Sequence, residues 1–84
     1  MSFTIKWNQK PQKYLGKLPK EISIRIIEKL DKVIEDPFRY LEHYEGADVY
    51  KLRIGDYRLL IDVDFTDRIL KIRVFDHRSR VYEK

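Results

Sequence analysis

Three cations, Lys51, Arg53 and Arg58, have a spacing that could bind a phosphate or another anion. Apolar and charged residues alternate around them, which is the period of a β-strand with one buried face. If Gly55 and Asp56 form a hairpin turn, Arg53 and Arg58 lie directly opposite each other, about 5 Å apart. Like charges in that position repel by up to about 1 kcal/mol. We therefore expect an anion here; the alternative is that both side chains extend into water and interact weakly.

The last residues add groups suited to proton transfer and to base stacking. A strand ending at Phe75 leads into His77, which can exchange a proton near neutral pH, and Tyr82 could stack on a nucleic-acid base. The alternatives are an ordinary surface histidine and a tyrosine ring packed on the sheet edge. Two distant histidines without a cysteine do not form a typical zinc cluster, and three scattered glycines form no phosphate-binding loop. We expect no metal and no other cofactor.

The elements that must position these groups follow from the hydrophobic periodicity. A strand alternates over residues 3–7, a short helix follows Asn8, and a second helix extends from Pro19 to Asp36 with apolar residues at helical spacing. Residues 37–48 are expected to form a long connection. Three strands are then predicted at residues 49–54, 57–65 and 68–75. One domain, residues 1–84, accounts for the whole length.

Two predicted turns, Gly55–Asp56 and Thr66–Asp67, give one consistent register. In it, Ile61 lies opposite Ile72 and Leu59 opposite Val74. The buried face is Leu52, Ile54, Leu59, Ile61, Val63, Leu70, Ile72 and Val74; the other is Lys51, Arg53, Arg58, Leu60, Asp62, Lys71, Arg73 and Phe75. We also expect Asp62 to pair with Lys71. The predicted fold class is a two-layer α+β domain, with the first strand at an edge of the sheet.

Charge is unevenly distributed along the chain, whose net charge is +4. Residues 1–20 contain five lysines and no acid, and residues 49–84 contain nine bases against six acids. A basic sheet with aromatic side chains favours a polyanionic partner, although a merely solvated surface is the alternative. The absence of cysteine fits a reducing compartment, and no apolar run is long enough to span a membrane. We therefore expect a cytoplasmic protein.

The sequence resembles the RelE/ParE toxin superfamily of bacteria and archaea. The resemblance covers nearly the whole chain and rests on Asp36–Leu41, on Gly46 followed by Tyr50–Arg58, and on His77–Tyr82. It implies a toxin of a type II toxin–antitoxin pair, with a RelE-like fold and a cognate antitoxin as partner. RelE-like members cleave messenger RNA, typically on the ribosome, whereas ParE-like members inhibit DNA gyrase and lack the nuclease residues.

The resemblance also implies a set of site residues. The catalytic candidates are Arg58, Arg78, Lys51, His77 and Tyr82, and Arg53 is an RNA-binding cation. The basic face of the predicted sheet and the stretch after Phe75 add Arg73, Lys71 and Arg80 as further RNA-binding cations. Arg53 stands where the best-known members have a second lysine, so a lysine base is not expected at that position.

RNA carries its own nucleophile, the 2′-hydroxyl, so such a site needs neither a catalytic serine nor a metal. It must align that hydroxyl with the scissile bond and stabilise the phosphorane. We expect a metal-independent endoribonuclease that leaves a 2′,3′-cyclic phosphate and a 5′-hydroxyl. Three alternatives remain open: a gyrase-inhibiting toxin, a non-catalytic nucleic-acid-binding homologue, and a domain whose basic face docks an acidic partner.

Overall fold

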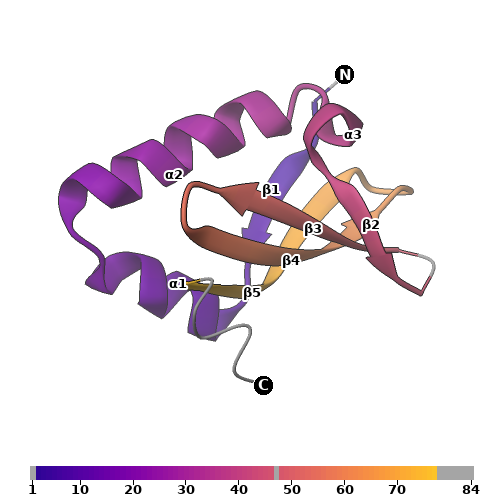
Figure 1. The fold of residues 1–84 in the computed structure, drawn as a ribbon. Helices are drawn as coiled ribbons and strands as arrows, with labels where there is room; N and C mark the ends of the chain where they lie inside the picture. Colours follow the sequence, from indigo (N-terminus) through magenta and orange to yellow (C-terminus); the bar gives the residue numbers. More distant parts are fainter. Residues whose placement is uncertain (1, 47, 78–84) are drawn as a thin grey trace.

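A five-stranded sheet forms one layer of the molecule (Figure 1). The computed structural model describes residues 2–46 and 48–77. The strands are β1 (Thr4–Trp7), β2 (Glu42–Glu45), β3 (Val49–Ile54), β4 (Tyr57–Asp64) and β5 (Ile69–His77). Their order across the sheet is β1-β5-β4-β3-β2, with β1 parallel to β5 and all other pairs antiparallel. The first strand thus lies at an edge, as the sequence predicts.

Helices form the second layer. They are α1 (Gln9–Lys17), α2 (Lys20–Val33) and the short α3 (Pro37–Tyr40). Figure 1 shows α1 and α2 on one side of the sheet. Ile26, Leu30 and Val33 of α2 are buried in one apolar cluster with the inward side chains of β3, β4 and β5. The expected two-layer α+β class is confirmed. Among the described residues, no helix is both long and apolar enough to cross a membrane.

The predicted register of the first hairpin is confirmed. Gly55 begins the two-residue turn with a φ of 58°, a left-handed conformation that glycine adopts without steric cost. Arg53 consequently pairs with Arg58 across the strands, and Leu52 pairs with Leu59. The leucines enter the core while the arginines lie on the outer face of the sheet, because side chains alternate along a strand.

The register of the second hairpin is correct only in its first half. Ile61 pairs with Ile72 as expected, but an irregularity follows: Leu60 pairs with Val74 and Leu59 with Phe75. Arg73 is therefore the additional residue of a β-bulge, which exchanges the two faces of the strand beyond it. Phe75, expected outside, is buried, whereas Val74, expected in the core, is only half-buried.

Aromatic packing gives a physical reason for this exchange. The Phe75 ring lies 5.0 Å from that of Tyr14, 5.7 Å from that of Tyr57 and 5.9 Å from that of Trp7, measured between centroids. Aromatic rings bury large apolar areas and gain further energy from tilted contacts. A valine at the same place would fill less of this space, so the bulge favours burial of the phenylalanine.

The stretch from residue 37 to residue 48 is not the irregular connection that the sequence suggests. Pro37 begins α3, and β2 adds a fifth strand by pairing with β3. Pro37 and Gly46 led to the loop prediction, yet a proline is compatible with the first turn of a helix. Gly46 lies just beyond β2 with a φ of 61°, where it begins the turn toward β3.

Candidate functional site

The three predicted cations of the first hairpin lie on the outer face of the sheet, opposite the helices. Lys51 and Arg53 belong to β3 and Arg58 to β4. Arg53 is directly opposite Arg58, and its Nε donates a hydrogen bond to the carbonyl oxygen of Gly55 at 3.3 Å. Lys51 is paired with Leu60 on one side and with Glu42 of β2 on the other. The structure therefore brings these three cations together as predicted.

Arg58 lies between a base and an acid. Arg53 faces it from β3, and Asp76 faces it from β5. The Arg58 side chain is half-buried and its Nε atom is buried. An Asp76 carboxylate oxygen accepts a hydrogen bond from the backbone N–H of His77 at 2.8 Å, which holds the carboxylate in place. The sequence-based site did not include Asp76, because the predicted register, which lacks the bulge, places Phe75 and not Asp76 opposite Arg58.

His77 lies away from the outer basic face. It pairs with Tyr57, and the two rings meet edge to face with centroids 5.4 Å apart. Because Phe75 and His77 are two residues apart on one strand, both point to the helix side. There His77 lines a cavity of about 190 Å³ together with Arg25 and Asp56. The expectation that His77 lies beside Lys51 and Arg58 is therefore wrong.

The two predicted RNA-binding cations of β5 differ in their surroundings. Arg73 forms a forked ion pair with Asp62, with N–O distances of 3.0 and 2.6 Å. Asp62 was expected to pair with Lys71, which is its backbone partner across the strands. The bulge brings the Arg73 guanidinium to Asp62, and a guanidinium binds a carboxylate through two parallel hydrogen bonds where an ammonium cannot. Lys71 is exposed to solvent.

Three further candidates, Arg78, Arg80 and Tyr82, lie outside the described residues. Their assignments remain predictions from the sequence.

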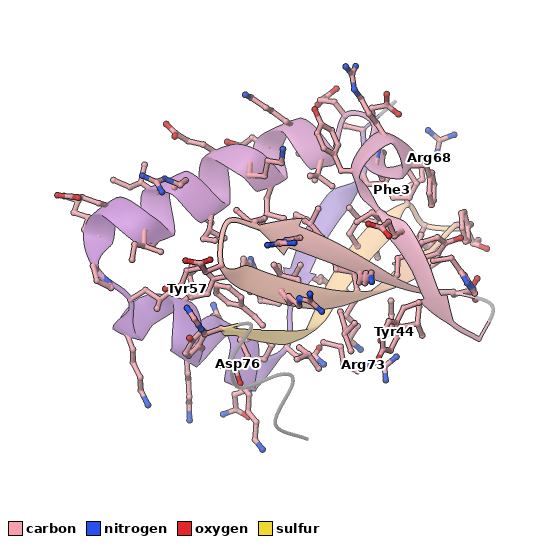
Figure 2. The ribbon with its side chains drawn as sticks, in the orientation of Figure 1. Phe3, Tyr44, Tyr57, Arg68, Arg73 and Asp76 are labelled. Carbon is pink, nitrogen blue, oxygen red and sulfur yellow. The ribbon has the colours of Figure 1, made fainter. Side chains whose placement is uncertain are left out.

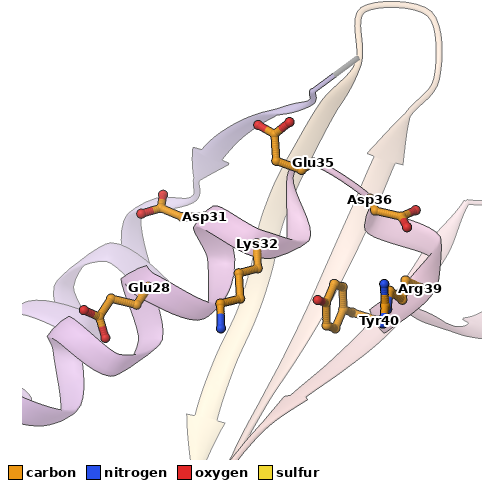
Figure 3. A pocket seen from close by; sticks show the side chains of 7 residues that line it. All are labelled: Glu28, Asp31, Lys32, Glu35, Asp36, Arg39 and Tyr40. Atoms are coloured by element: carbon orange, nitrogen blue, oxygen red, sulfur yellow. The ribbon is translucent and has the colours of Figure 1, made fainter.

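An acidic pocket lies between the end of α2 and α3, on the helix side of the molecule (Figure 3). It has a volume of about 700 Å³ and is lined by Glu28, Asp31, Lys32, Glu35, Asp36, Arg39 and Tyr40. No three histidine or acidic side chains among the described residues are close enough to hold a metal ion. Four acids of the chain, Glu28, Asp31, Glu35 and Asp36, thus gather on the helix side, away from the basic cluster.

Comparisons with known proteins identify the fold and the family. The family model described as the ParE toxin of a type II toxin–antitoxin system, parDE, matches residues 5–82. A chain of the archaeal RelE–RelB complex from Pyrococcus horikoshii OT3 is similar, with a TM-score of 0.82 and 30% identity over 95% of this chain and 99% of that chain.

Two further structures are similar. A chain of the toxin–antitoxin complex RelBE2 from Mycobacterium tuberculosis has a TM-score of 0.82 and 26% identity, over 93% of this chain and 100% of that chain. The isolated RelE toxin from E. coli has a TM-score of 0.78 and 23% identity over 98% and 93% of the two chains, and shows likeness of fold alone. No curated protein matches the sequence. The chain therefore belongs to the ParE toxin family, within the RelE/ParE superfamily, and is a toxin of a type II toxin–antitoxin system.

Proposed function

We propose that this toxin is an endoribonuclease that cleaves messenger RNA on the ribosome. The single observation that carries the proposal is the pairing of Arg53 with Arg58 on the outer face of the sheet. Two guanidinium groups directly opposite each other on adjacent strands repel; Asp76 faces Arg58 from β5, and a bound anion would offset the repulsion further. A phosphate diester is such an anion, and guanidinium groups bind phosphate oxygens through paired donors.

The proposed reaction uses the nucleophile of the RNA itself. The 2′-oxygen loses its proton and attacks the neighbouring phosphorus, and the P–O5′ bond then breaks. The 5′-oxygen takes up a proton, which leaves a 2′,3′-cyclic phosphate and a 5′-hydroxyl. Because the added charge appears on the phosphorane oxygens, a fixed cation at that position stabilises the transition state more than the ground state.

Each cation of the cluster has a proposed role. Arg58 stabilises the phosphorane, because it lies in the middle of the sheet and is the more buried of the two arginines. Arg53, at the exposed side of the hairpin, holds a phosphate oxygen. Lys51 is the proposed proton-transfer group, since it lies on the same face, while His77 points to the helix side. Arg78 and Tyr82 are assigned from the sequence alone, to phosphate holding and to base stacking.

Asp76 has a positioning role in this proposal. It faces Arg58 across the strands and is itself fixed by the His77 backbone N–H. A carboxylate in that position orients the guanidinium before substrate arrives, which lowers the cost of organising the site.

Inhibition of DNA gyrase is the second candidate function, and one observation favours it. The family model that matches residues 5–82 is that of the ParE toxin. A gyrase inhibitor requires no phosphorane-stabilising arginine, so the Arg53–Arg58 pair favours the nuclease.

We also infer that a cognate antitoxin binds this toxin. Similar chains occur in the solved RelE–RelB and RelBE2 complexes. The small core of an 84-residue chain gains stability from any partner that binds only the folded state, by about 2.7 kcal/mol at a hundredfold excess over Kd.

One experiment separates the two toxin activities. The purified chain is incubated in parallel with ribosomes programmed with a defined message and with gyrase and supercoiled or relaxed DNA. Cleavage of the message at a position within the ribosome, with 2′,3′-cyclic phosphate ends, supports the nuclease. Intact message together with blocked supercoiling would refute it in favour of gyrase inhibition.

A further inference from the structure

A groove between α1 and β5 gathers cations that the proposed catalytic cluster does not use. It has a volume of about 500 Å³ and is lined by Lys10, Pro11, Lys13, Tyr14, Lys17, Arg73, Val74, Phe75 and Asp76. Five of these residues, three of them lysines, belong to the acid-free, lysine-rich stretch at residues 1–20. The tertiary structure places that stretch against the last strand of the sheet.

The groove exists because β1 is short. It pairs with β5 only from Ile69 to Ile72, and α1 packs along β5 beyond that point. In the view of Figure 2, Arg73 and Asp76 both lie at the lower edge of the sheet. The α1 helix thus supplies one wall of the groove and the second half of β5 supplies the other.

The lysines form a row along α1. Lys10, Lys13 and Lys17 are three and four residues apart, which places them on one side of the helix. At a rise of 1.5 Å per residue, the row extends over about 10 Å. All three side chains are exposed, and none forms an ion pair with a residue that the structure describes.

Lys17 lies in the last turn of α1, where a cation stabilises the helix, but Lys10 and Lys13 do not serve the helix in this way. The first turn of α1 contains no acid, and Lys10 lies there although a cation near a helix N-terminus is unfavourable by about 0.3–1 kcal/mol. The one acid in the groove wall, Asp76, already accepts a hydrogen bond from the His77 backbone. An external polyanion is therefore the ligand that this concentration of positive charge fits.

We propose that the α1–β5 groove binds the backbone of a single-stranded RNA, as an extension of the proposed cleavage site. Asp76 connects the two sites, because it lines the groove and also faces Arg58 across the strands. A strand whose scissile phosphate lies at Arg58 can therefore continue over the edge of β5 toward α1. Lysines bind phosphates as flexible point charges, so the groove would hold RNA without selecting a sequence.

This inference rests on the proposed nuclease function, but binding can be measured separately from cleavage. The probe is a short 2′-O-methyl oligoribonucleotide of mixed sequence, which lacks the nucleophile and cannot be cleaved. The groove variant changes Lys10, Lys13 and Lys17 to glutamine. The control variant changes Lys6, Lys20 and Lys32 to glutamine and so loses the same total charge. These three lysines are exposed but do not line the groove. A third variant with arginine at positions 10, 13 and 17 keeps the charge.

The expected result is a change in salt dependence. Each phosphate contact to a single strand contributes about 0.7 to the slope of log K against log salt, so three lost contacts lower the slope by about 2. Raising salt from about 50 to about 200 mM should then weaken wild-type binding roughly 20-fold more than binding by the groove variant. The control and the arginine variant should keep the wild-type slope, and melting curves should show all four proteins folded.

If the slope of log K against log salt is the same for the groove variant and the control, the inference is overturned. It is also overturned if the groove variant loses affinity for an antitoxin but not for the oligonucleotide. Cleavage of ribosome-bound message by the wild type is measured in the same series. Cleavage together with equal slopes would support the nuclease proposal and refute the groove proposal. A difference in slope without cleavage would support RNA binding in the groove and refute the nuclease proposal.

Discussion

Replacing Arg58 by alanine should abolish most of the cleavage and leave the fold intact. If the guanidinium stabilises the phosphorane, its loss should lower the single-turnover rate by roughly 10²–10³-fold, as for other preorganised transition-state donors. That factor corresponds to about 2.7–4 kcal/mol of transition-state energy. Arg58→Lys should recover only part of the rate, because an ammonium cannot offer two parallel donors to one phosphate.

The stability of the same variant follows from the two neighbours of Arg58. Removing it relieves repulsion from Arg53 and loses attraction to Asp76, and each cross-strand term is worth about 0.2–1 kcal/mol with opposite sign. The half-buried stem of the arginine adds a modest packing loss. The free energy of unfolding should therefore change by no more than about 1–2 kcal/mol, which chemical denaturation can resolve.

The assay is single-turnover cleavage of ribosome-bound message, with circular dichroism melts of each protein. Arg39→Ala is the matched control, since Arg39 is an exposed arginine of α3 in the acidic pocket. It should cleave at the wild-type rate. Equal rates for wild type and Arg58→Ala, with both proteins folded, would remove Arg58 from the mechanism. If Arg58→Ala fails to fold, Arg58→Met, which keeps an apolar stem, replaces it in the same comparison.

Two further predictions concern the stability of the fold. Ile61 has no exposed surface, so Ile61→Ala should lower the free energy of unfolding by about 2–5 kcal/mol. Ile24 is 46% exposed, and Ile24→Ala should change the free energy of unfolding by about 0.5 kcal/mol or less. Similar urea midpoints for the two variants would contradict the described core. Gly55→Ala should lower the free energy of unfolding by about 1 kcal/mol, because the φ of residue 55 is +58°, a conformation that alanine rarely adopts. The added Cβ would have no atom within 4 Å, so this loss comes from the backbone conformation and not from a clash. Gly16→Ala, in open space on α1, should instead stabilise by up to about 1 kcal/mol, and thermal melts that gave both variants the same sign would refute this reasoning.

The basic cluster could be predicted from the sequence because local rules determine it. Gly55 and Asp56 fix a two-residue turn, and strand alternation then places Arg53 opposite Arg58 without any knowledge of distant contacts. The same rules fail at Arg73, where one additional residue inserts a bulge. The alternating pattern of β5 does not predict this bulge, because Val74 and Phe75 are both apolar and either could face the core.

Features that depend on long-range packing could not be predicted from sequence patterns. The acid-free run of lysines was visible, but its position beside Arg73 and Asp76 depends on how α1 packs along β5. Likewise, His77 belongs to a strand that the sequence predicted to end at Phe75. The continuation of β5 through His77 determines the side to which that ring points, and so removes it from the basic face.

The position of β1 in the sheet has a consequence for when the sheet can form during synthesis. Thr4, near the start of the chain, finds its partner only when Ile69 has been synthesised, because β1 pairs with β5 alone. A ribosome makes β1 before β5, so β1 has no partner strand while the helices and the three strands between them are synthesised. Contacts between residues so far apart in sequence also form slowly. The five-stranded sheet therefore cannot be completed during synthesis until β5 has been made, and a nascent chain lacks the β1–β5 pair until that point.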